Sequence, residues 1–179
     1  GGGGGAGGAG GNASPGPGAA SYGGAGLQVA IAGPTTVTAV GGLNPQTNER
    51  QWFAGGGGGA PRGVGGAGSA LTVGTAPRAG AGAGAPGSND TVGGHGEAGT
   101  GSGGGGNGWG NPAIGGNGGS GTVIVRYQIG ELTAQAKASG GSVSFFGDKI
   151  IHTFTASGDF NAPASISNVE YVCIGGGGA

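Results

Sequence analysis

Apolar residues in the last third of the chain occur in short runs that are separated by turn residues. The run at 122–129 (TVIVRYQI) is apolar and β-branched, as expected of a buried strand. Residues 142–146 and 149–155 flank a two-residue turn with the spacing of a β-hairpin. Residues 169–174 (VEYVCI) read as a further strand, and no stretch carries a helical period with caps. This pattern predicts an all-β structure without significant helix.

Glycine is concentrated in the first 121 residues, which hold 47 of the 56 glycines. Short apolar segments interrupt the glycine tracts, and their alternation predicts short strands at 27–31, 35–40 and 70–73. We therefore divide the chain into a glycine-rich body at 1–130, closed by the strand 122–129, a small polar linker at 131–141, and a β segment at 142–179.

The composition is glycine-rich but almost uncharged. The chain of 179 residues contains 56 glycines and 9 prolines, about 36% together, which exceeds the share at which an aperiodic chain is usually called disordered. Only 7% of the residues are charged and the net charge is −1, whereas disordered chains stay dissolved through high charge. The same low charge argues against nucleic acid as a partner. Apolar runs also fall short of a membrane span.

An ordered glycine tract must satisfy its backbone groups through other backbones, because it has no side chains to bury. A left-handed extended helix with three residues per turn makes no internal hydrogen bonds and points its N–H and C=O groups outward. Without Cβ atoms, such helices can bond side by side in a polyglycine-II bundle. We therefore expect a short-stranded β-sandwich continuous with a polyglycine-II helix bundle. The alternative is a flexible glycine linker between small β domains. Central helices need glycine almost everywhere, which predicts a bundle core of Gly55, Gly56, Gly57, Gly58, Gly59, Gly103, Gly104, Gly105 and Gly106.

The end of the chain repeats its beginning. The strand 169–174 leads into the run 175–179 (GGGGA), whereas the same run at 2–6 has no strand before it. We therefore expect this segment to be close to one full repeat, either of a tandem array or of subunits that lend a terminal strand to a neighbour. A strand added in this way completes the neighbour's sheet, and a head-to-tail contact that never closes gives an open filament. The donor strand would contain Val169, Tyr171, Val172, Cys173 and Ile174, and the acceptor strand would contain Val123, Ile124, Val125 and Tyr127.

Residues that could carry chemistry are few and scattered. His95 and Glu97 offer two weak metal ligands without a third nearby, and His152 alternates with apolar residues, as expected of a packed histidine. The seven acidic residues form no paired general acid and base. The single Cys173 lies in an apolar strand, where we expect a buried small hydrophobe. We expect no enzyme, no metal and no cofactor.

Three motifs in a fixed order resemble a known class of domain. They are GDKIIHTFTASGDF, then VEYVCIGGGGA, and finally GGNGGSGTVIVRY after the glycine tracts. Read circularly, this order is similar to the glycine-rich repeat domains of large extracellular fibre and phage tail-fibre proteins. The resemblance implies a β-plus-polyglycine architecture at the cell surface, with a structural or adhesive role and no catalytic residues.

Three functions remain open from the sequence. The leading expectation is a structural subunit of an extracellular filament, whose partners are other copies of itself. The alternative is a tail-fibre-like adhesin module that binds a cell-surface glycan or protein through a loop such as 44–53. There Trp52 and Phe53 could either stack on sugar rings or pack against the end of the bundle. Ice binding by a flat face of small residues is a third, weaker reading.

Overall fold

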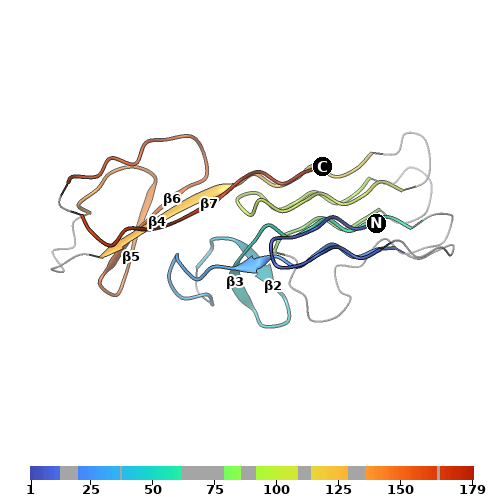
Figure 1. Cartoon of the computed structure of the whole chain (residues 1–179), viewed down its shortest axis with the longest axis horizontal. Coiled ribbons are helices and arrows are strands. Elements are labelled where there is room, and N and C mark those ends of the chain that lie inside the picture. The colour runs from blue at the N-terminus through green and yellow to red at the C-terminus, as the bar shows by residue number, and fades with distance from the viewer. Residues whose placement is uncertain are drawn as a thin grey trace.

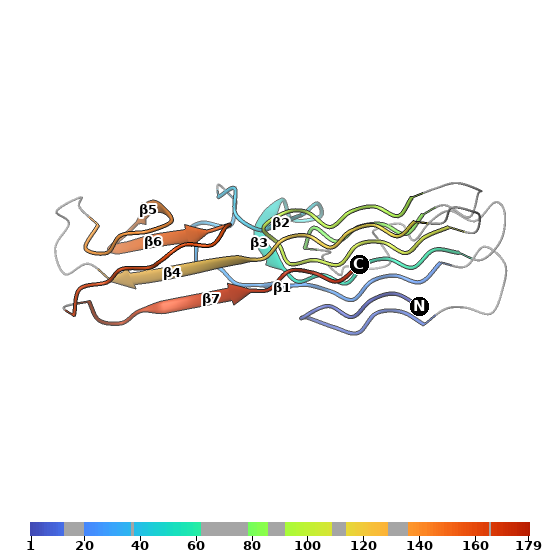
Figure 2. The ribbon, with the colours of Figure 1, turned by 90° about the horizontal axis from the view of Figure 1, so that it is seen from above.

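The fold consists of two antiparallel sheets from which extended glycine segments run in one direction (Figures 1 and 2). The computed structural model describes residues 1–12, 20–36, 38–61, 79–85, 92–108, 114–128, 136–164 and 166–179. These ranges contain no helix, so the expected all-β class is confirmed.

The larger sheet is built from the strands that the apolar runs predict. It contains β4 (Thr122–Gln128), β5 (Ser142–Phe146), β6 (Lys149–Phe154) and β7 (Glu170–Ile174), in the order β5-β6-β4-β7. The hairpin turn between β5 and β6 begins at Gly147, whose φ of 60° is one that glycine adopts without strain. The strand predictions for this half of the chain therefore hold to within a residue or two.

The sequence pattern predicted the strands of the smaller sheet less accurately than those of the larger one. It contains β1 (Leu27–Gln28), β2 (Gly42–Asn44) and β3 (Glu49–Phe53), in the order β1-β3-β2. The strand expected at 27–31 is only two residues long, and the hairpin of β2 and β3 replaces the loop expected at 44–53. The extended piece expected at 70–73 lies outside the described residues.

The strand predicted at 35–40 is wrong: the residues that the structure describes there, 35–36 and 38–40, form no strand, and 35–36 lie in a turn. The amide of Thr38 donates to the carbonyl of Pro34 at 3.2 Å, and the Thr38 hydroxyl accepts from the amide of Val40 at 3.2 Å. Threonine hydroxyls that bond the local backbone compete with strand pairing. Alternation of threonine and valine therefore misled the prediction here.

Gln51, on β3, fixes the irregular segment that follows β1. Its side chain is fully buried: Oε1 accepts from the amide of Ala32 at 2.6 Å, and Nε2 donates to the carbonyl of Gly33 at 2.6 Å. Its backbone amide also donates to the carbonyl of Val40 at 3.1 Å, and its carbonyl accepts from Val29 at 3.0 Å. One residue thus holds both ends of the segment 29–40 against the sheet.

An apolar cluster joins the two sheets. Ile31 and Phe53 come from the side of the smaller sheet, and Ile124 and Ile151 come from β4 and β6 of the larger one. Phe53 is only 1% exposed. Of the two positions suggested for this ring, it therefore packs in the core and is closed to a sugar.

The other face of the larger sheet is covered by the loops around β5 and β6. Tyr127 and Ile150 pack there with Ala138, Phe160 and Ile166. Ala138 belongs to the segment predicted as a linker at 131–141, of which residues 136–141 are described. The amide of Ala138 donates to the Tyr127 hydroxyl at 3.0 Å, so this part of the predicted linker packs on the sheet. The domain boundary itself stays a prediction.

His152 is fully buried on this face, as the alternation predicted. Its Nδ1 lies 2.6 Å from the carbonyl oxygen of Gly140, which can only accept, so Nδ1 carries the proton. Nε2 then accepts from the hydroxyl of Tyr127 at 3.3 Å. The ring also stacks on Tyr127 and meets Phe160 edge-on. The imidazole thereby has a partner for both of its nitrogens within the core.

We predict that Gln51→Asn destabilises the protein by about 1–3 kcal/mol, because the shortened amide leaves buried backbone groups without partners. Asparagine tolerates the positive φ of 65° at this position, so backbone strain does not add to the effect. Urea unfolding measures the change. The matched control is Gln28→Asn, which loses only the half-buried bond to the carbonyl of Arg50. Equal unfolding midpoints for the two variants would contradict the role given to Gln51.

Candidate polymer interface

The strand expected to act as donor lies beside the strand expected to act as acceptor, within one chain. Among the described strands, β7 is an edge strand and pairs only with β4, in antiparallel orientation. Of the expected acceptor residues, three lie opposite β7 and Tyr127 lies just beyond the paired register; Val169 precedes β7. The register is Thr122↔Ile174, Val123↔Cys173, Ile124↔Val172, Val125↔Tyr171 and Arg126↔Glu170.

Only one face of β7 is packed. Val172 and Ile174 contact the apolar cluster between the sheets. On the opposite face Tyr171 is 75% exposed, and Cys173 is exposed as well. The expectation of a buried Cys173 is therefore wrong, because the residues that cover this face of the sheet pack over Tyr127 and Ile150.

A charged cluster fastens the start of β7. The Arg126 guanidinium donates to Oε2 of Glu170, and Lys149 Nζ lies 3.5 Å from Oε1 of the same carboxylate. The hydrogen bond from Arg126, helped by the positive charges of Arg126 and Lys149, lowers the pKa of Glu170 below its ordinary value of 4.5. Arg126 also donates to the carbonyls of Ala30 and Ile31, at 3.3 and 3.4 Å. One side chain thus links β7, β4 and the smaller sheet.

Sequence reasoning missed this cluster, although a signal was present. Arg126 and Glu170 are the single charges within the strand sequences TVIVRYQ and EYVCI. A lone charge inside a mostly apolar strand needs a partner when the strand packs. When one strand carries a single positive charge and another a single negative charge, the two charges predict that the strands pair.

The strands of both sheets pass directly into glycine segments. β7 continues into 175–179 and β3 continues into 54–61, while 20–26 leads into β1 and 114–121 leads into β4. Figure 2 shows these segments running side by side away from the sheets. The sheets therefore set the spacing at which the glycine segments begin.

Hydrogen bonds from the predicted core segment at 103–106 follow a period of three. The amides of Gly103 and Gly106 donate to the carbonyls of Gly55 and Gly58, each at 2.8 Å. Between them, Gly104 donates to Gly178 at 3.0 Å and Gly105 donates to Gly94 at 2.8 Å. Three successive amides thus donate to three different segments, and the fourth donates to the same segment as the first.

The predicted core segment at 55–59 shows the same period and is buried throughout. Its amides at Gly56 and Gly59 both donate to the segment 20–26, at 3.0 and 2.7 Å. Gly58 donates to Gly82 at 3.0 Å, and the carbonyl of Gly57 accepts from Gly3 at 2.9 Å. A β-strand bonds with a period of two to neighbours on two sides, so this pattern is different from that of a sheet.

Close approach explains why glycine fills these segments. A Cβ atom on Gly57 would overlap the carbonyl oxygen of Gly104, and one on Gly104 would overlap that of Gly116. Ser102 is an exception that has a partner for its side chain: its hydroxyl donates to the carbonyl of Ala79 and accepts from the amide of Gly55. The Ser102 side chain thus takes the place of a backbone hydrogen bond in this interior.

The remaining candidate residues do not gather into a site. Nδ1 of His95 accepts from the amide of Asn117 at 2.9 Å, so this nitrogen already has a partner. Across the described ranges, no group of three or more histidine, cysteine or acidic side chains is placed to hold a metal ion. In the same part of the chain, no helix has the length and apolar character needed to cross a membrane.

Comparisons of the chain with family models, with curated proteins and with solved structures found no match. The likeness to fibre and tail-fibre repeat domains therefore stays a prediction from the three sequence motifs.

We predict that the Glu170 cluster stabilises the fold only above acidic pH. Because the pKa of Glu170 is lowered on folding, its contribution is fully present above about pH 4.5 and is lost as the pH falls through the lowered value. Glu170→Gln should therefore melt below the wild type at pH 7, and the two melting curves should converge near pH 2. Asp159→Asn is the matched loss of an exposed carboxylate. A difference for Glu170→Gln that stays constant with pH would contradict the ion-pair account.

We predict that Gly104→Ala destabilises the protein by about 1–3 kcal/mol or more, because the new methyl group overlaps a backbone oxygen that cannot move aside. Gly176→Ala is the control, since its Cβ would meet nothing closer than 3.8 Å and alanine restricts the unfolded chain. Urea unfolding separates the two variants.

In the wild type, the amides of 55–59 and 103–106 should exchange slowly with solvent. Exchange as fast as in an unfolded peptide would show that the segments are loose tethers.

Proposed function

We propose that this chain is a structural module of an extracellular filament, and that its glycine segments form a polyglycine-II bundle capped by a small β-sandwich. The hydrogen bonds that recur at every third residue support the bundle. The apolar cluster shared by the two sheets supports the sandwich. The extracellular location rests on the resemblance to fibre repeats alone.

The observation that carries the filament proposal is the way β7 and the glycine segment 175–179 are attached. Together they form one extended piece: β7 is the edge strand of the larger sheet, paired with β4, and 175–179 continues it into the glycine segments (Figure 2). In the described backbone, the glycine part adds two hydrogen bonds, from Gly177 to Gly119 at 2.8 Å and from Gly104 to Gly178 at 3.0 Å. An edge strand with one packed face can be exchanged without rebuilding the rest of the fold.

Exchange of this piece between copies would build a polymer. The same register, the same ion pair and the same glycine contacts serve equally when β7 comes from a neighbouring copy, which is the logic of strand addition and domain swapping. If each copy gives its β7 to one neighbour and receives β7 from another, the contact is head-to-tail, and such a contact builds an open filament where the rotation between copies does not close a ring. The result is a filament of β sheets and glycine bundles in series.

Cys173 provides a direct test, because it is the only cysteine of the chain and lies opposite Val123 on β4. Directly opposite residues of an antiparallel pair have Cα atoms about 4.5–5.5 Å apart, within the reach of a disulfide. We predict that Val123→Cys, oxidised after assembly, forms bridges between chains if strands are exchanged. Non-reducing gel electrophoresis should then show a ladder of covalent multimers.

The control is Val125→Cys, on the same face of β4 but opposite Tyr171, where Cys173 is too far for a bridge. It should give no ladder. Oxidation of dilute monomers of Val123→Cys should instead lock β7 in its own chain and prevent assembly. Assemblies of Val123→Cys that contain only bridges within one chain would rule out strand donation.

A further inference from the structure

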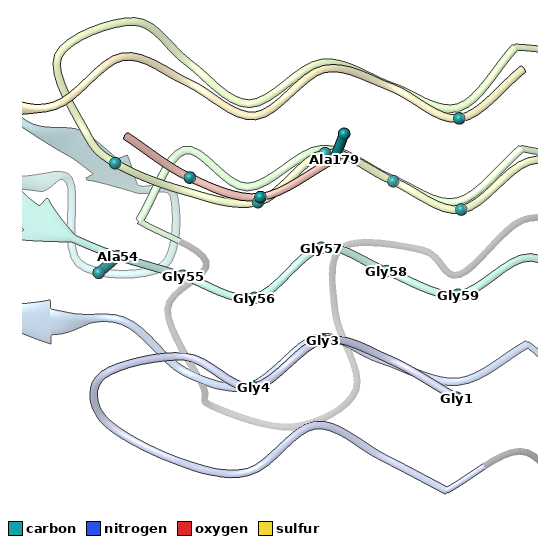
Figure 3. A pocket seen from close by; sticks show the side chains of 18 of the residues that line it. Gly1, Gly3, Gly4, Ala54, Gly55, Gly56, Gly57, Gly58, Gly59 and Ala179 are labelled. Carbon is teal, nitrogen blue, oxygen red and sulfur yellow. The ribbon is translucent and has the colours of Figure 1, made fainter. Parts of the chain in front are cut away.

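An open groove runs through the glycine bundle. It has a volume of about 780 Å³, and the described residues that line it are glycine and alanine with Asn107, none of them charged or aromatic. The walls belong to four stretches: residues 1–6, 54–59, 101–107 and 176–179, with Gly115 beside them. Figure 3 shows Gly55 to Gly59 along the groove, with Ala179 on one side and Gly1 to Gly4 on the other. Peptide groups therefore form almost the whole surface.

Three of the four walls share one sequence. The pentapeptide GGGGA occurs at 2–6, at 56–60 and at 175–179, and each of these copies contributes to the lining. Each copy also bonds to the interior of the bundle: Gly3 donates to Gly57 at 2.9 Å, and Gly178 accepts from Gly104 at 3.0 Å. This pentapeptide is thus complementary to its own backbone.

The groove lies on the open side of the central segment 103–106. Among the described residues, backbone hydrogen bonds connect that segment to five neighbours, which are 55–59, 79–85, 92–97, 114–121 and 175–179. Equal rods packed side by side fit six around one, which leaves one position beside 103–106 that no described segment occupies. The groove borders 103–106 between two of the five, 55–59 and 176–179, where a sixth rod would lie.

Two glycines of the lining are not explained by contacts within the described chain. A Cβ atom on Gly4 or on Gly178 would meet no atom within 4 Å, unlike one on Gly57 or Gly104. The amides of Gly4 and Gly178 also donate to no other described residue. Glycine costs backbone entropy on folding, and it is needed where another backbone approaches closely. Both glycines face open space that suits such an approach.

We propose that this groove binds a GGGGA tract of a second copy of the chain, in the extended threefold conformation. A guest of about five residues at 3.1 Å per residue would lie along Gly55–Gly59. It would bond to peptide groups on the walls, and a groove whose described lining has no charge and no aromatic ring favours bare backbone over a glycan or a charged peptide. The proposal uses the threefold geometry of the proposed bundle, but it does not require exchange of β7.

The test is titration of the folded chain with a capped peptide of residues 1–10 (GGGGGAGGAG), followed by amide chemical shifts. The amides of Gly4 and Gly178 should shift in a saturable manner. Gly178→Val, whose side chain fills the groove, should weaken binding by about tenfold or more. Gly158→Val is the matched control: it lies in a loop beside Phe154 and away from the lining. A peptide with valine at every third position should not bind.

Sedimentation velocity then tests whether the guest is a second copy. Wild-type chains should associate with rising concentration, and Gly178→Val should associate less than Gly158→Val. Absence of a saturable shift, equal peptide affinity for the two valine variants, or a monomer at every concentration would each overturn the proposal. Oxidised monomeric Val123→Cys, with β7 locked in its own chain, should still bind the peptide. That result separates failure of strand donation from failure of the groove.

Discussion

The structure depends on hydrogen bonds that run sideways between glycine backbones. The central segment 103–106 donates from its amides in three directions, and each direction meets a different segment at 2.8–3.0 Å. This is possible only where no Cβ atom stands between the backbones, as the overlaps at Gly57 and Gly104 show. The interior therefore gains its stability from satisfied peptide groups, which offset the large entropy loss of ordering glycine.

The sheets supply what the glycine segments lack. An apolar cluster around Phe53 and Ile124 fixes the two sheets against each other, and four strands then enter the bundle in defined positions. Gln51 and Arg126 reinforce this end of the molecule by bonding irregular backbone near Ile31. A side-chain core thus sets the alignment, and the backbone bonds extend it along the molecule.

The difference between side-chain packing in the sheets and backbone bonding in the glycine segments also applies to the proposed assembly. β7 is attached through one neighbouring strand, one packed face and a charged cluster, and the segment after it lies on the rim of the groove. The two proposals therefore place contacts between copies at adjacent parts of one edge. Exchange of β7 would use side chains and strand pairing, whereas the groove would use bare backbone. Both contacts follow from groups that are only partly covered within one chain.

Period and composition determined the broad structure of this protein. Apolar runs bounded by turn residues were sufficient to locate β4 to β7, because β-branched and aromatic residues favour strands and the turns between them mark their ends. Tertiary structure decided the rest. It turned 35–40 away from a strand, paired β7 with β4 in the same chain, and left Cys173 exposed at an uncovered edge. These outcomes depend on which surfaces meet, and a tract of glycines has no side-chain pattern from which its neighbours could be read.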